Sequence, residues 1–145
     1  MNLIILALYL TYAAFEGWRE GIYWHVKGGS RYYDWQPKVE EHVIFTIQRA
    51  IITIMGSILL FFTGMAWYWC VASVIGYALT FTFMHNGIMY LTRNEIDPTI
   101  YHKRFWAQST SSVAKTTKFM TPISRTIQFI VGVLLNVGAF IGNGA

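Results

Sequence analysis

Charged side chains along this chain are confined to two blocks, residues 16–49 and 93–125. Crossing a hydrocarbon core about 30 Å thick takes roughly 20 helical residues, and the apolar stretch between the blocks is long enough to cross twice. The pattern predicts an integral membrane protein with one charged rim, and it predicts a turn at Thr63-Gly64 between the two middle crossings. Three stretches contain no Asp, Glu, Lys or Arg: 1–15, 50–92 and 126–145.

Four helices follow from the apolar stretches and from the residues that end them. Gly28 provides a stop for the first helix, and Pro37 suits the first turn of the second. Pro98 disfavours a helical residue before it, so the third helix must end ahead of it, and Pro122 opens the fourth. The expected helices cover about 3–27, 37–62, 66–94 and 122–141.

The fold class expected from this pattern is an all-α integral membrane protein, an antiparallel bundle of four transmembrane helices in a single domain, 1–145. Residues 98–120 mix cations with aromatic side chains, a composition typical of a segment at the membrane interface. A solvated loop is the alternative for this segment.

Composition agrees with a membrane protein. The chain is 54% hydrophobic, 17% aromatic and 12% charged, outside the range of an ordinary soluble domain. Residues 1–15 lack the basic start of a signal peptide, so we expect a retained helix there. The single cysteine, Cys70, excludes an intramolecular disulfide.

The positive charges predict the orientation. All 11 Lys and Arg residues fall where the expected helices enter or leave one side of the membrane, and the other side has none. The positive-inside rule then places the charged rim in the cytoplasm, or in the equivalent compartment of an organelle, with both termini outside.

Each expected helix also has a polar face. Glu16 and Glu20 lie one turn apart on the first helix, and Arg49 lies about 10 Å deeper than His42 on the second. Ionisable residues at membrane depth normally face a bundle interior or a water-filled cavity, so we expect a polar cavity open to the cytoplasm. Because neighbouring helices alternate in direction, the residues expected to meet at one level are Glu16, Glu20, His42, Arg49, His85, Asn86, Arg93 and Arg125.

This set suggests a metal site. Two carboxylates and two imidazoles, from Glu16, Glu20, His42 and His85, suit zinc, iron or manganese. No Glu-x-x-His or His-Glu-x-x-His motif supports it, so the metal prediction rests on the constellation alone. The alternative is that Glu16 and Glu20 pair with Arg49 and Arg93 as polar contacts between helices.

The arginines suggest an anionic substrate. Arg49, Arg93 and Arg125, with Asn86, could hold a phosphate or carboxylate, which guanidinium binds well. In that scheme Glu16, Glu20 and Arg49 are the catalytic candidates, and a carboxylate that does not ligate metal is the general base. Alternatively, Arg93 and Arg125 extend to the membrane rim, as cations at helix ends usually do.

Four functions fit these features. The first is a small membrane enzyme that acts on a lipid or lipid-linked anionic substrate, and the second is a non-catalytic accessory subunit of a respiratory, photosynthetic, secretory or viral membrane complex. The others are a b-type haem protein using His42 and His85, and a carrier or channel. The expected partners are membrane lipid and either further copies of the chain or other membrane subunits, with no nucleic acid.

Overall fold

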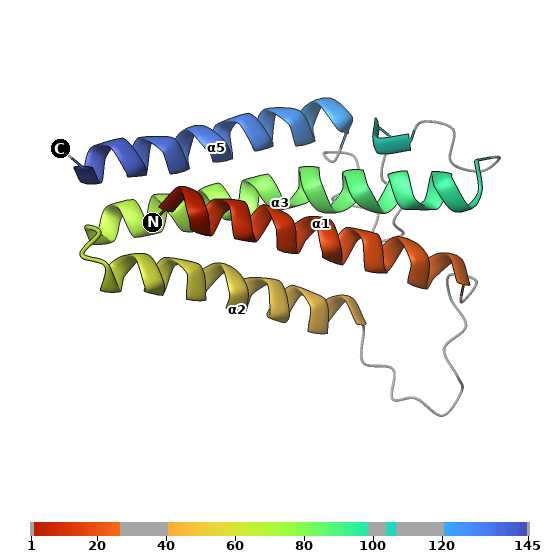
Figure 1. The fold of residues 1–145 in the computed structure, drawn as a ribbon, viewed down its shortest axis with the longest axis horizontal. Helices are drawn as coiled ribbons and strands as arrows, with labels where there is room; N and C mark the ends of the chain where they lie inside the picture. Colours follow the sequence, from red (N-terminus) through yellow and green to blue (C-terminus); the bar gives the residue numbers. More distant parts are fainter. Residues whose placement is uncertain (1, 27–40, 99–103, 107–120, 145) are drawn as a thin grey trace.

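The structure is a computed structural model that describes residues 2–26, 41–98, 104–106 and 121–144. Within these ranges the chain is all-helical, with four α-helices and no strand, which confirms the helical class. Successive helices alternate in direction, so both termini lie at one end of the molecule (Figure 1). The elements are α1 (Asn2–Val26), α2 (Glu41–Phe62), α3 (Trp67–Ile96), the short 3₁₀ helix η1 (Arg104–Trp106) and α5 (Pro122–Gly144).

The longest helix, α3, is the centre of the bundle. Helices α1 and α5 pack along it, and η1 covers part of its C-terminal half. Helix α2 packs against α3 and α1, so that α2 and α5 lie on opposite sides of the α1–α3 pair (Figure 1). The four helices therefore do not surround one common axis equally.

Helix ends lie where the local chemistry predicts them. Thr63 and Gly64 form the turn after α2, and Gly64 has a φ of 85°, which glycine adopts without steric cost. Helix α3 ends at Ile96, ahead of Asp97 and Pro98. Thr121 caps α5, because its Oγ1 accepts a hydrogen bond from the Ser124 amide at 3.1 Å. The expected start of the second helix at 37 and most of the expected interfacial segment 98–120 lie outside the described residues.

Glycines bring α1, α3 and α5 into direct backbone contact. A Cβ atom at Gly17 would overlap the backbone carbonyl of His85, and one at Gly132 of α5 would lie 2.5 Å from the carbonyl oxygen of Gly76. Helix α2 is less close, since a Cβ at Gly56 would lie 3.3 Å from the nearest side-chain atom, which belongs to Ile5. Small residues that let helix backbones approach are characteristic of helix packing in membranes.

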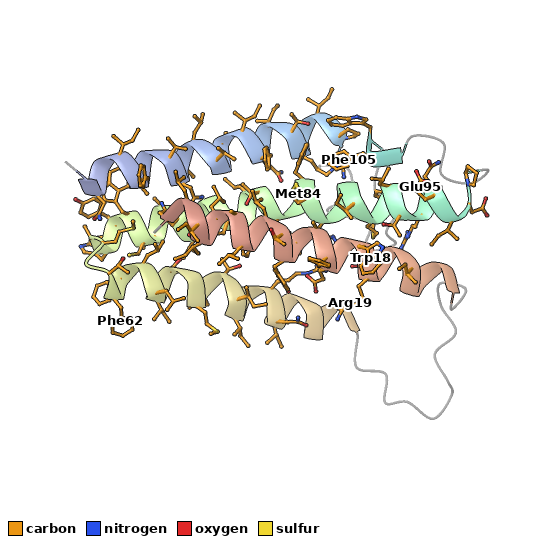
Figure 2. The ribbon with its side chains drawn as sticks, in the orientation of Figure 1. Trp18, Arg19, Phe62, Met84, Glu95 and Phe105 are labelled. Carbon is orange, nitrogen blue, oxygen red and sulfur yellow. The ribbon has the colours of Figure 1, made fainter. Side chains whose placement is uncertain are left out.

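Polar residues share the interior with a small apolar core, and many large apolar residues are exposed. Helices α3 and α5 are long and apolar enough to cross a membrane. Phe62, at the end of α2, points away from the bundle and is 81% exposed (Figure 2). Buried polar or charged residues are Asn2, Glu16, Thr53, Ser57, Ser73, Thr80, His85, Asn94, Arg125 and Asn136.

Candidate functional site

Charged side chains from three helices meet in one place, which we call the charge cluster: Glu16 and Glu20 of α1, Arg49 of α2 and His85 of α3. The two glutamates lie on one face of α1 because they are four residues apart. Arg19 lies at the margin of the cluster, between α1 and α2 (Figure 2), with its Nη2 3.7 Å from Oε1 of Glu16.

The guanidinium of Arg49 contacts both carboxylates. Its Nε donates to Oε2 of Glu16 at 3.1 Å, and its Nη2 donates to Oε2 of Glu20 at 3.3 Å. Its Cζ lies 4.7 Å from the centroid of the Phe81 ring, within range of a cation–π interaction. The side chains of Glu16 and Glu20 are only 3% and 15% exposed, and that of Arg49 is 26% exposed. Arg49 thus contacts two nearly buried anions at once.

His85 connects the cluster to α3. Its Nε2 lies 2.8 Å from Oε2 of Glu20 and 3.1 Å from Nη2 of Arg49, and its Nδ1 lies 2.9 Å from Oδ1 of Asn86. Phe81 stacks on the imidazole with ring centroids 5.0 Å apart. An imidazole held between a carboxylate and an amide can serve as a general acid or base, provided that a substrate reaches it.

Hydroxyl groups continue the polar contact between α1 and α2 beyond the cluster. The hydroxyl groups of Tyr9 and Thr53 are 3.0 Å apart, and Thr53 also donates to the backbone carbonyl of Arg49 at 2.7 Å. Thr53 follows Arg49 by one helical turn and therefore shares its face. Helix α2 consequently meets α1 through a seam of polar groups.

The remaining expected site residues divide between two places. Asn86 contacts His85, and Arg93 lies close enough to Glu20 to stabilise its charge. Arg125 lies between α5 and η1, where its Nη2 donates to the carbonyl of Phe105 at 3.2 Å and the residue is 1% exposed. The expected site residues therefore do not all meet at one place. Most of them lie in or beside the charge cluster between α1, α2 and α3, whereas Arg125 lies apart, between α3, η1 and α5.

The metal prediction stays a prediction. Among the described residues, no group of three His, Cys, Asp or Glu side chains is arranged to hold a metal ion. The side chain of His42, one of the four expected ligands, lies outside the described part. The carboxylates of Glu16 and Glu20 face the guanidinium of Arg49 in this structure.

Small residues on α1 position the cluster, and the charge pattern that predicts the site does not reveal them. Ala13, Gly17 and Gly21 follow one another at intervals of four on α1, and Gly17 lies directly against the backbone of His85. This contact holds the glutamates of α1 beside the imidazole of α3. The spacing of small residues by four is visible in the sequence and is a known signal for close helix packing.

Comparison with known proteins identifies no relative. No protein-family model matches the chain, and no curated protein and no solved structure is similar to it. Helical bundles carry many unrelated functions, so the fold alone indicates none. The function must be inferred from the residues of the site and from the surface.

Proposed function

We propose that the chain is an integral membrane protein whose four α-helices all cross the bilayer. The helices have 22 to 30 residues, which at about 1.5 Å per residue corresponds to roughly 33–45 Å, enough to span a hydrocarbon core. Large apolar residues are exposed along all four of them, such as Leu8, Met55, Ile75 and Leu134. An apolar exterior of this extent is expected to face lipid or other membrane subunits.

The charges of α1 and α2 are compatible with crossing because they pair inside the bundle. A charge at membrane depth costs at least a few kcal/mol unless it is paired or hydrated. Arg49 compensates the carboxylates of Glu16 and Glu20, and the side chains of both glutamates face the interior. The positive-inside rule places the charged rim in the cytoplasm and both termini on the opposite side.

We further propose that the protein is a non-catalytic subunit of a larger membrane assembly. The observation that carries this proposal is the double contact of Arg49, which engages Glu16 and Glu20 at once. Carboxylates engaged in this way join α2 to α1, as polar contacts between membrane helices do. The exposed apolar faces of α2 and α5 then remain available for lipid and partner subunits.

Purification in a mild detergent tests this proposal. The tagged chain, expressed at its natural level, is expected to co-purify with stoichiometric partner subunits, while a tag-only control does not. Recovery as a single homo-oligomer under the same conditions would contradict the subunit role.

A second candidate function, a membrane enzyme, is favoured by the contact between Glu20 and His85. A carboxylate 2.8 Å from an imidazole, with Asn86 at the other ring nitrogen, resembles the acid–base pairs of hydrolytic sites. Its substrate would be a lipid or lipid-linked anion, and its cofactor zinc, iron or manganese. Metal analysis of protein purified without chelator tests whether this enzyme would be metal-dependent. Stoichiometric metal in the wild type that is lost in the Glu20→Gln variant would support a metal site, and metal at background level in the wild type would exclude it.

A further inference from the structure

The guanidinium of Arg49 lies in a group of side chains that comes entirely from two other helices, α1 and α3. Carboxylates approach two of its nitrogens, an imidazole nitrogen lies 3.1 Å from Nη2, and an aromatic ring lies against it. Carboxylates and aromatic faces are the groups that bind guanidinium in proteins. We call this group the cation cage; it consists of Glu16, Glu20, Phe81 and His85.

None of the four cage residues belongs to α2. Its carboxylates and rings belong to α1 and α3, whose backbones touch at Gly17 and come close at Gly21. Helix α2, which supplies the cation, approaches less closely, because a Cβ at Gly56 would meet only side chains, the nearest atom at 3.3 Å. It meets α1 through hydroxyl groups and the charge cluster. The host and its occupant therefore belong to different helices, although α2 also packs against the α1–α3 pair.

The cage also has an acceptor that Arg49 does not use. Arg49 contacts only the Oε2 atoms of the two carboxylates. Oε1 of Glu16 is buried and accepts no hydrogen bond within 3.5 Å from the described residues; Arg19 Nη2 lies 3.7 Å from it, and the Tyr12 hydroxyl also faces the Glu16 carboxylate. A planar cation placed without the tether of α2 could donate to both oxygens of one carboxylate, the bidentate geometry that guanidinium prefers.

We propose that the cation cage is a binding site for a guanidinium cation, and that Arg49 occupies it as an internal ligand. A primary ammonium group is a weaker alternative ligand, because it is a compact, strongly hydrated charge without the planar fork of donors. This inference goes beyond the proposed subunit role, and it does not depend on a partner subunit. It assigns to the cluster a cation of defined chemistry, with α2 as its competitor.

Chemical rescue of the full-length Arg49→Ala variant in detergent tests the proposal. The probe is methylguanidinium chloride at about 10 mM, far below the molar concentrations at which guanidinium denatures proteins. Methylurea, which has similar shape and no charge, and NaCl at equal ionic strength are the controls. Methylguanidinium is expected to raise the melting temperature of Arg49→Ala by several degrees, and neither control compound is expected to do so.

Two comparisons show whether the cation binds in the cage. The affinity for methylguanidinium is measured by calorimetry. It should be at least tenfold lower for the double variant Arg49→Ala/Glu16→Gln than for Arg49→Ala alone. The wild-type chain should also bind methylguanidinium at least tenfold more weakly than Arg49→Ala does. Equal binding by wild type and Arg49→Ala would place the cation elsewhere and overturn the proposal. If Arg49→Ala loses its helical circular dichroism, the same measurements are made on Arg49→Gln. A folded variant that responds equally to methylguanidinium and methylurea also overturns the proposal.

Discussion

At the scale of single residues, Arg49 is the side chain on which the charge cluster depends. Its removal leaves Glu16 and Glu20 almost buried without their main cation, and breaking a buried ion pair typically costs about 3–5 kcal/mol. Because Arg49 is itself 26% exposed, we expect Arg49→Ala to lower the free energy of unfolding by about 3 kcal/mol, the lower end of that range. Unfolding in increasing sodium dodecyl sulfate, followed by circular dichroism, measures it.

Arg19 provides the matched control for this prediction. It also faces Glu16, but at 3.7 Å and with 56% of its side chain exposed. Exposed pairs contribute between zero and about 1 kcal/mol, so Arg19→Ala should change stability by less than about 1 kcal/mol. If the two alanine variants are equally stable, Arg49 is not the cation that compensates the glutamates.

Hydrogen bonds at the opposite end of the bundle allow a second prediction at this scale. The hydroxyl of buried Tyr77 donates to Oδ1 of Asn2 at 3.1 Å, and Nδ2 of Asn2 donates to the carbonyl of Asn136 at 2.8 Å. Tyr77→Phe removes the first bond without changing the ring, so we expect a loss of about 0.5–1.5 kcal/mol in the same unfolding assay. Tyr68→Phe, at a position 53% exposed, should lie within about 0.5 kcal/mol of the wild type. A Tyr77→Phe variant as stable as Tyr68→Phe would contradict the role of this bond.

At the scale of helices, the contact between α1 and α3 depends on glycine. A Cβ at Gly17 would overlap the carbonyl of His85, whereas a Cβ at Gly138 of α5 would meet no atom within 4 Å. Gly17→Ala should therefore push the two helices apart and cost about 1–3 kcal/mol, as overpacked sites do. Gly138→Ala should be neutral or stabilising by up to about 1 kcal/mol, because alanine favours helix. Equal effects of the two substitutions would mean that backbone contact at Gly17 is unimportant.

Helices and their polar faces were predictable from the sequence because both depend on local chemistry. Pro98 and Pro122 mark helix ends by their missing amide and fixed φ, and Gly64 marks the turn by its backbone freedom. The spacing of Glu16 and Glu20 by four gives a shared face without any knowledge of the neighbours. These faces are sufficient to suggest pairing of the glutamates with Arg49 and Arg93, and the structure shows the contacts with Arg49.

Neighbour relations between helices could not be predicted in the same way. Helical periodicity shows which residues share a face, but it does not show which helix that face contacts. Arg125 was therefore expected beside the glutamates, although α5 packs on α3 and places Arg125 against Phe105 of η1. The side-by-side contact of α1 and α3 follows from Gly17 and Gly21, whose spacing is a packing signal that the charge pattern does not contain.

At the scale of the whole molecule, the arrangement of charges makes a prediction about sidedness. The C-terminal end of α1 and the C-terminal end of α5 lie at opposite ends of the bundle, so they must be on opposite sides if all four helices cross (Figure 1). The Cys70→Ser variant removes the only native thiol, so single cysteines can then be introduced at Ser30 and at Asn143. In intact cells a membrane-impermeant maleimide should label Asn143→Cys and should label Ser30→Cys only after permeabilisation, because the positive-inside rule keeps the charged rim in the cytoplasm. Labelling of both positions in intact cells would exclude four crossings, and the reverse pattern would keep the crossings but invert the orientation.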